Sequence, residues 1–283
     1  LRELTRVARE IGDGKLESRA RLGDGPGEIG DLARSIDEMA ERIQRQLSTQ
    51  KELLATVSHE LRTPLTSLRG YAETLLDGGL EDEARREGFV RVIRDQAERL
   101  QALVDDLLSL AELERPEAAL RRERFDLREL IARQVGLFAA AAERGGLKLV
   151  LEGEGPVEAN ADRARLEQVI ANLLDNAIKY SEPGAPVALT ARAADGWLTI
   201  EVRDRGVGIP SRDLDRIFER FYRVDRARSR STGGTGLGLA IVRNVAHAHD
   251  GDVTVESREG EGSTFRLRVP MLASVAPLFR EDG

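Results

Sequence analysis

The sequence predicts a multi-domain protein in which an all-α region of coiled-coil helices precedes an α/β sandwich. Two observations support this prediction. Apolar residues recur at helical and heptad spacing up to Pro116, whereas strand-like alternation of apolar and polar residues begins only after about Arg122. Proline cannot continue a helix, so Pro116 marks the start of the linker between the two regions.

Composition excludes several classes of protein. The 283 residues carry a formal net charge of −7, whereas nucleic-acid binding needs a basic surface, so no nucleic-acid partner is expected. The absence of cysteine excludes disulfides and thiolate metal sites. No apolar run is long enough to cross a bilayer, and the chain begins at Leu1 within an amphipathic pattern. We therefore expect a soluble fragment of a longer protein, whose missing N-terminal part could include membrane spans upstream of residue 1.

Two short amphipathic helices are predicted first, joined by a glycine-bearing connector that ends at Gly27. The stripe of the first helix consists of Leu1, Leu4, Ala8 and Ile11. The second helix begins near Glu28 and has apolar residues at heptad a/d positions, namely Ile29, Leu32, Ile36, Met39 and Ile43. This arrangement resembles a HAMP module, the parallel four-helix relay of membrane receptors, and assigns a first domain to residues 1–46.

No breaker ends the second helix, so it is expected to continue from about Glu28 to beyond Leu75. Its leucines at 47, 54, 61 and 68 are seven residues apart, but the step from Ile43 to Leu47 is four. Four extra residues in a heptad pattern form a stutter, which locally unwinds a coiled coil. We therefore expect an adjustable joint between the first domain and His59.

A turn at residues 77–80 and a returning helix over about 83–114 complete a helical hairpin, assigned to a second domain at 47–118. The buried face of the returning helix is predicted to contain Phe89, Val92, Ile93, Leu100, Leu103, Leu107, Leu110 and Leu113. Two helices cannot cover stripes of this length. The expected solution is a homodimer whose hairpins form a four-helix bundle.

The segment from Ser58 to Leu65 reads SHELRTPL and contains the most reactive group of this hairpin. The imidazole of His59 is largely neutral and nucleophilic near pH 7, and Glu60 could hold its Nδ1 proton. Leu61 and Leu65 belong to the buried side. This string matches the H-box of sensor histidine kinases, which implies that His59 accepts a phosphoryl group. Thr63, one turn further on the same face, could orient a water for the reverse phosphatase reaction.

Strands are predicted at 147–151, 186–190, 197–202, 252–256 and 264–269, with helices at 127–144, 162–180 and 236–249. This mixture predicts a sheet with helices on one face, in a third domain at 119–273, followed by a tail at 274–283. Two further histidines, His247 and His249, lie at the end of the last helix and match no acceptor motif. We expect them to be structural or surface residues.

Asn172 and Asn176 are one turn apart on the predicted helix that Asp162 opens, and their amide oxygens are suitable ligands for a hard cation. They resemble the N-box of the ATP-binding fold that histidine kinases share with Hsp90, gyrase and MutL. The resemblance implies that ATP and Mg²⁺ bind here. Asn176 would hold Mg²⁺, Asn172 would lie near the γ-phosphate, Lys179 would contact phosphate, and Tyr180 would border the nucleotide.

Two glycine segments complete the predicted pocket. The first consists of Asp204, Gly206 and Gly208 after a strand, and the second of Gly234, Gly236 and Gly238 before an apolar helix. Glycine lets the backbone approach a ligand, and a helix N-terminus favours phosphate. The resemblance implies that Asp204 accepts the adenine amino hydrogen. Residues 217–223 resemble the F-box, and a mobile lid with Arg226, Arg228 and Arg230 is expected between the two segments.

A phosphate acceptor and a phosphate donor site on one chain predict an ATP-dependent protein-histidine kinase of a two-component system. His59 would pass its phosphoryl group to an aspartate on the receiver domain of a response regulator, and the chain would be the cytoplasmic portion of a cell-membrane sensor. One alternative is an Hsp90- or MutL-like ATPase, which would need a hydrolytic base where Asn172 stands. A second is a non-catalytic signalling scaffold. The input signal, the cognate regulator and cis or trans phosphorylation are not specified by the sequence.

Overall fold

The computed structural model describes residues 2–20, 27–79, 81–113, 120–225 and 234–271. It consists of two compact units, Leu1–Val90 and Arg91–Gly283. The predicted tail at 274–283, the linker residue Pro116 and the lid arginines Arg226, Arg228 and Arg230 lie outside the described residues.

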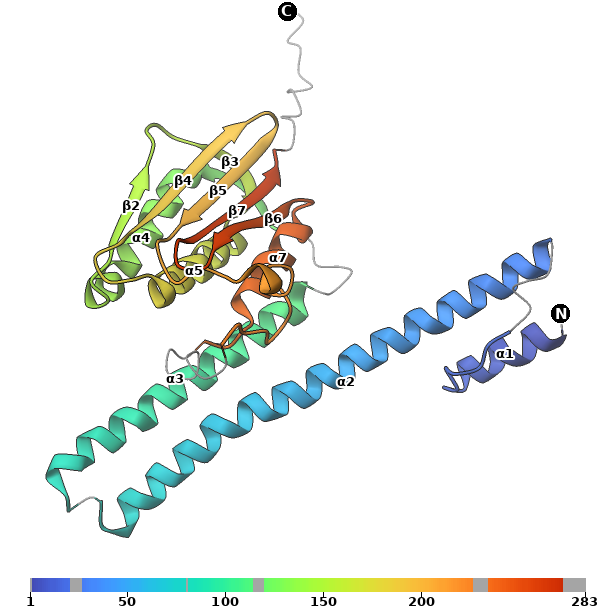
Figure 1. The fold of residues 1–283 in the computed structure, drawn as a ribbon, viewed down its shortest axis with the longest axis horizontal. Coiled ribbons are helices and arrows are strands. Elements are labelled where there is room, and N and C mark those ends of the chain that lie inside the picture. Colours follow the sequence, from blue (N-terminus) through green and yellow to red (C-terminus); the bar gives the residue numbers. More distant parts are fainter. Residues whose placement is uncertain (1, 21–26, 80, 114–119, 226–233, 272–283) are drawn as a thin grey trace, which may run out of the picture. The chain divides into compact units, whose positions relative to one another are not determined.

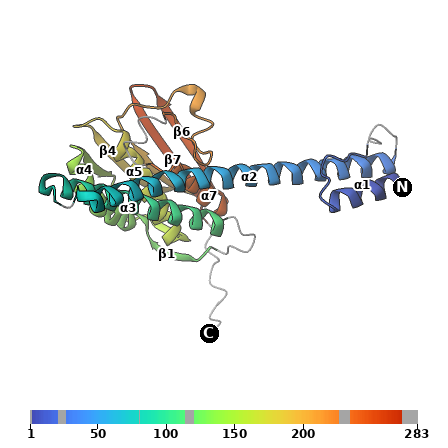
Figure 2. The same cartoon turned by 90° about the horizontal axis from the view of Figure 1, so that it is seen from below.

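The first unit begins with α1 (Arg2–Gly12) and α2 (Glu28–Thr74), and α1 lies beside the beginning of α2 (Figures 1 and 2). Their contact is a small apolar cluster of Leu4, Val7, Ala20 and Ala33, packed against Ile11 and Ile36. The connector is tied to α2 because the backbone N–H of Ala20 donates to Asp37 Oδ1 at 2.8 Å.

The heptad face of α2 is largely exposed in the single chain. Ile29, Leu32 and Met39 are 51%, 47% and 58% exposed, whereas the fully buried positions in this part of α2 are taken by small residues such as Ala33 and Ala40. A single chain has only two helices here, and the small residues allow these to approach closely. The large side chains of Ile29, Leu32 and Met39 therefore stay exposed in the single chain, whereas Ile36 packs against the cluster beside α1.

α2 passes without a break through the stutter and through Pro64, as predicted, and ends in a π-helical turn, η1 (Leu75–Gly79). Gly78 supplies the positive φ of 108° that this turn needs. The prediction that Leu65 lies on the buried side is wrong for the single chain, because its side chain is 59% exposed. The single chain provides no helix that covers this position.

α3 (Glu83–Leu113) begins in the first unit and continues into the second. Its predicted apolar face is confirmed: the eight expected side chains are all partly or fully buried. Leu103 and Leu110, in the second unit, are each only 4% exposed.

The second unit is built on a five-stranded sheet in the order β2-β4-β5-β7-β6. Its strands are β2 (Lys148–Glu152), β4 (Pro186–Ala194), β5 (Trp197–Arg203), β6 (Asp252–Arg258) and β7 (Gly262–Pro270). β2 pairs with β4 in parallel and the other pairs are antiparallel. One face is covered by α4 (Leu127–Arg144), α5 (Arg163–Tyr180) and α7 (Gly238–Ala248), as Figure 1 shows. The predicted α/β sandwich is thereby confirmed.

A second, two-stranded sheet was not predicted. β1 (Arg122–Asp126) and β3 (Glu158–Asp162) pair antiparallel. Their sequences, RERFD and EANAD, lack the apolar alternation by which strands are recognised. Both strands end in an aspartate that caps the following helix: Asp126 accepts from the N–H of Arg128 and Asp162 from that of Arg165.

His249 is a structural residue, as predicted, and it is fully buried after the end of α7. Its Nδ1 donates to the carbonyl of Val245 at 2.9 Å, and its Nε2 accepts the backbone N–H of Asp162 at 3.1 Å. This pair of bonds requires a neutral ring. The ring thus joins the end of α7 to the beginning of α5, the two helices that carry the predicted pocket motifs.

Candidate functional site

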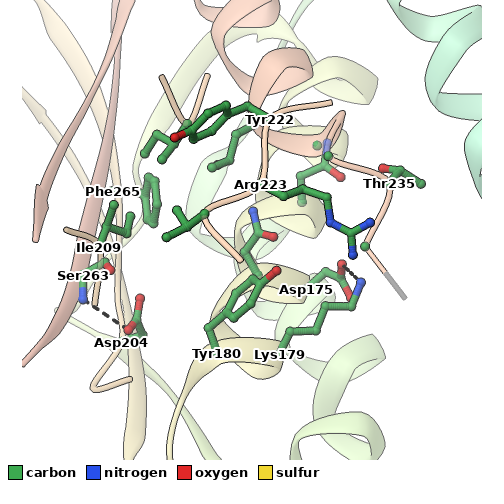
Figure 3. A pocket seen from close by; sticks show the side chains of 18 of the residues that line it. Asp175, Lys179, Tyr180, Asp204, Ile209, Tyr222, Arg223, Thr235, Ser263 and Phe265 are labelled. Carbon is green, nitrogen blue, oxygen red and sulfur yellow. Dashed lines mark hydrogen bonds and ion pairs between the residues drawn. The ribbon is translucent and has the colours of Figure 1, made fainter. Parts of the chain in front are cut away.

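A pocket of about 500 Å³ opens in the second unit where α5, α7 and the ends of β5 and β7 meet. Asp204, Ser263, Ile209 and Phe265 lie at one end of it, and Asp175, Lys179, Arg223 and Thr235 lie at the other (Figure 3). The structure brings nine of the ten predicted binding residues to its lining, which are Asn172, Asn176, Lys179, Tyr180, Asp204, Gly208, Gly234, Gly236 and Gly238.

Asp204 is a buried carboxylate at the first end of the pocket, with 7% of its surface exposed. Its Oδ1 accepts the backbone N–H groups of Gly206 at 3.0 Å and Ser263 at 3.1 Å. Burial raises the pKa of this carboxyl, although the two hydrogen bonds act in the opposite direction. Both bonds involve Oδ1, so Oδ2 is available to a donor from a ligand.

The predicted glycine Gly206 does not line the pocket and has a structural role. A methyl group on it would overlap the carbonyl oxygen of Tyr180, with which its turn is packed. Gly208 does line the pocket, at a φ of 65°, and a methyl group there would overlap the carbonyl of Arg258. Backbone conformation and close packing therefore both require glycine at position 208.

The face of α5 towards the pocket carries the amides and the lysine. The Nδ2 of Asn172 is buried and has no hydrogen-bond partner among the described residues. A buried polar group without a partner is costly, so a ligand that accepts its N–H would be bound favourably. Lys179, predicted to contact phosphate, forms an ion pair between its Nζ and Asp175 Oδ2 at 2.6 Å (Figure 3).

The second glycine segment leads into α7. Gly236 has a φ of 74°, and its carbonyl accepts the N–H of Phe221 at 2.8 Å. The backbone N–H of Leu237 donates to the hydroxyl of Thr235 at 3.2 Å. A loop of this kind at a helix N-terminus can present backbone N–H groups to an anion.

Several lining residues were not singled out from the sequence. The polar ones among these are Asp106 on α3, Asp175 on α5, Asp225, Thr235, Glu259 and Ser263. Phe138 on α4 was likewise missed. The predicted F-box contributes Ile217, Tyr222 and Arg223, and the hydroxyl of Tyr222 donates to Asp213 at 2.7 Å. The heptad pattern of α3 gives no signal that Asp106 lines a pocket, because the pattern describes only the helix itself.

The other predicted reactive group, His59, lies in the first unit on the exposed surface of α2. The hydroxyl of Thr63 donates to the backbone carbonyl of His59 at 3.2 Å. Within the described part of α2, no hydrogen bond joins Glu60 to His59, so that predicted contact is absent from this structure. Neighbouring residues of a helix point about 100° apart, which separates the two side chains.

The described residues hold no group of three or more histidine or carboxylate side chains that could bind a metal ion by themselves. Asn172 and Asn176 both line the pocket, and their amide oxygens are neutral ligands of the predicted kind. Magnesium is commonly bound by one or two protein groups together with substrate phosphates, so this donor set fits Mg²⁺ accompanied by a polyphosphate.

In the part of the chain that is described, no helix is long and apolar enough to span a bilayer.

Comparison with known families gives three matches in chain order. Residues 1–45 match the HAMP domain, residues 49–116 the His Kinase A (phospho-acceptor) domain, and residues 161–273 the histidine kinase-, DNA gyrase B- and HSP90-like ATPase family.

Individual proteins agree with these matches. The chain is 35% identical to the sensor histidine kinase WalK of Bacillus subtilis over 246 residues, which are 86% of this chain but only 40% of WalK. The solved structure of the histidine kinase AdeS of Acinetobacter baumannii is 30% identical, with a TM-score of 0.61, over 75% of this chain and 98% of AdeS. The histidine kinase ThkA, solved in complex with the response regulator protein TrrA, is 26% identical, with a TM-score of 0.67, over 83% of this chain and 66% of that chain. The chain therefore belongs to the sensor histidine kinase family and contains its HAMP, phospho-acceptor and ATPase domains.

Proposed function

We propose that this chain is an ATP-dependent protein-histidine kinase that phosphorylates itself on His59 and passes the phosphoryl group to a response regulator. The observation that carries the proposal is a pocket with a buried carboxylate, Asp204, at one end and a glycine segment at a helix N-terminus at the other. The adenine amino group needs a hydrogen-bond acceptor such as this carboxylate. A polyphosphate needs N–H donors such as those of the glycine segment. An exposed histidine on the same chain supplies the acceptor.

Recognition of the nucleotide follows from the available groups. The Oδ2 of Asp204 would accept a hydrogen from the adenine amino group, and Tyr180 would border the nucleotide. The unpartnered Nδ2 of Asn172 would donate to a phosphate oxygen. Lys179 would exchange its ion pair with Asp175 for phosphate, and the glycine segment would donate through its backbone N–H groups.

Asn176 would hold Mg²⁺, and the ion would neutralise the charge that develops on the phosphate oxygens. The residues of this chain would position the γ-phosphate and His59 for the transfer. In the transfer itself, Nε2 of His59 forms a bond to the γ-phosphorus while the bond to the ADP oxygen breaks. The Nδ1 proton makes Nε2 the nucleophile, and Glu60 would hold that proton after a change of rotamer.

Phosphohistidine has a labile phosphorus–nitrogen bond, which suits a group that is passed on. We propose an aspartate of a receiver domain as the acceptor, supported by the complex of the structural relative ThkA with a response regulator protein. Thr63 would orient a water for the phosphatase reaction. Its hydroxyl is bonded to the carbonyl of His59, so it lies within one helical turn of the phosphorylated residue.

The domain boundaries remain part of the proposal, with a HAMP relay at 1–46, a phosphotransfer hairpin at 47–118, an ATP-binding domain at 119–273 and a tail at 274–283. The homodimer is also part of the proposal, and it would form through the exposed apolar face of α2. Attachment of the native protein to a membrane is supported only by the HAMP match and by the greater length of WalK.

Incubation of the purified chain with γ-labelled ATP and Mg²⁺ tests the activity. We expect label on the protein that is labile in acid and stable in alkali, and its loss in His59→Gln. The matched control is His247→Gln, because His247 is an exposed helix residue that matches no acceptor motif and should leave the label unchanged.

The alternatives give different results in the same experiment. Free phosphate without labelled protein would indicate a clamp-type ATPase, and neither product would indicate a scaffold. The phosphatase reaction is tested with a phosphorylated receiver domain and Thr63→Ala. We expect slower release of phosphate but unchanged labelling of His59, with Thr63→Ser as the control that keeps the hydroxyl.

A further inference from the structure

Asp106 connects the phosphotransfer hairpin to the nucleotide pocket. It lies on α3, in the part that belongs to the second unit, and it lines the pocket beside the glycine segment. The hydroxyl of Thr235 donates to its Oδ2 at 2.8 Å. The same hydroxyl accepts the backbone N–H of Leu237 at 3.2 Å. A chain of two hydrogen bonds therefore runs from the beginning of α7 to the carboxylate on α3.

The same side of α3 makes further contacts with the beginning of α5. The hydroxyl of Ser109 donates to Gln168 at 3.0 Å and accepts from Arg165 at 3.1 Å. Arg165 also forms an ion pair with Glu112 at 2.7 Å. Because residues 106, 109 and 112 are three apart, they follow one side of the helix. We refer to Asp106, Ser109 and Glu112 as the α3 strip.

Charge makes Asp106 the critical member of the strip. Asp106 lines the pocket together with Asp175 and Lys179, and the latter two lie at the proposed phosphate end (Figure 3). Burial raises the pKa of Asp106, and the charge of Asp175 acts in the same direction, while Thr235 and Lys179 oppose them. A triphosphate bound at the glycine segment would bring more negative charge to this place. Anions repel one another strongly where water is largely excluded.

The hydrogen bonds add a second conflict with the ligand. The N–H of Leu237 is directed to Thr235 and is therefore not available to phosphate while the Thr235 hydroxyl is held by Asp106. A nucleoside, which has no phosphates, would meet neither the charge of Asp106 nor the occupied N–H of Leu237. The conflict is thus specific to the phosphate end of the ligand.

We propose that the Asp106–Thr235 pair is a latch which holds α3 on the ATP-binding domain in the empty protein and which the phosphates of the nucleotide displace. The proposal rests on the nucleotide function inferred above. Among the described polar contacts of α3, the Glu112–Arg165 pair and the Ser109 bonds would remain after the latch opens. Nucleotide binding would therefore weaken the attachment of the domain to α3 and favour its release. Because the closed latch and the bound phosphates exclude each other, a substitution that weakens the latch should raise the affinity for the nucleotide.

Binding of a non-hydrolysable ATP analogue tests the latch, with adenosine as the ligand that lacks phosphates. We expect Asp106→Ala to bind the ATP analogue about tenfold more tightly than the parent chain, the effect of losing one hydrogen bond to a charged group. Asp106→Asn, which keeps an acceptor but not the charge, should show a smaller gain. Adenosine should bind all variants alike. The matched control is Asp105→Asn, an equal change of charge on the exposed side of α3.

The outcomes separate the latch from the proposed function. Equal affinity of the ATP analogue for the parent and for Asp106→Ala would overturn the latch and leave the nucleotide function intact. An equal gain for adenosine would also overturn it, because the effect would not arise at the phosphates. Failure of the parent chain and of Asp105→Asn to bind either ligand would overturn the nucleotide function, and with it the latch.

Release of α3 can be measured directly because the chain contains no cysteine. Glu112→Cys combined with Arg165→Cys places two thiols at the ion pair between the α3 strip and α5, and a short bifunctional thiol reagent would join them in the nucleotide-free protein. We expect the ATP analogue to slow the cross-linking several-fold and adenosine to leave it unchanged. Adding Asp106→Ala should slow it without any ligand. An unchanged rate in all these cases would contradict the proposal.

Discussion

The Nε2 atom of His249 accepts the backbone N–H of Asp162 at 3.1 Å, so the last residues of the α7 region hold the first turn of α5. The imidazole is fully buried, and burial lowers its pKa, with the nearby charge of Arg122 acting in the same direction. The two helices that carry the glycine segment and the asparagine pair are therefore joined through one neutral ring.

This geometry predicts a stability that depends on pH. The pKa of His249 is lowered by folding, so the neutral form is favoured in the folded chain. The stabilisation should be present above the unfolded pKa of about 6.5 and should decrease as the pH falls below it, by at most about 1.4 kcal/mol per pH unit. Urea unfolding between pH 8 and pH 5 measures it. His249→Gln should reduce the slope, and the exposed control His247→Gln should retain it.

Asp204→Asn should weaken nucleotide binding about ten- to a hundredfold while the domain stays folded. The asparagine oxygen can still accept the N–H groups of Gly206 and Ser263, but its NH₂ group would face the ligand as a donor. A donor opposite the adenine amino group leaves both unpaired, which costs about 1–3 kcal/mol or more. Calorimetric titration with an ATP analogue gives the affinity, and unchanged affinity would exclude Asp204 as the adenine partner.

Gly208→Ala should destabilise the chain far more than Gly155→Ala. Both glycines have a positive φ, 65° and 76° respectively, so both substitutions cost roughly 1–2 kcal/mol for the backbone. Only at Gly208 would the methyl group overlap the carbonyl of Arg258, whereas nothing lies within 4 Å at Gly155. Denaturant unfolding gives the free energies of unfolding of the two variants for comparison. Equal losses would mean that close packing at Gly208 contributes nothing.

Leu65→Glu should convert the proposed dimer into a monomer. The side chain of Leu65 is 59% exposed on α2 in the single chain, and a second copy would bury it in a four-helix bundle. A buried unpaired carboxylate is costly there. Light scattering gives the molar mass, with Arg62→Glu on the exposed surface of the same helix as the control. A dimer that persists in Leu65→Glu would place the interface elsewhere.

Much of the fold was predictable because its signals are local. The heptad leucines predicted α2 through Pro64, and the apolar stripe of α3 was correct at every one of the eight positions named for it. Alternation predicted the five strands of the main sheet. β1 and β3 were missed because their pairing depends on a partner more than thirty residues away along the chain, and not on a pattern of their own.

The sequence by itself predicted the chemistry from a histidine in an H-box, two asparagines one helical turn apart, a carboxylate before glycines, and a glycine segment before an apolar helix. Short motifs carry this information because each group needs only its own turn of helix or loop. Tertiary structure alone decided that Asp106 lies against Thr235 and that His249 holds Asp162. These contacts join residues 129 and 87 positions apart. Their hydrogen bonds offset the cost of burying polar groups, and that burial depends on the packing of distant elements, which no local pattern records.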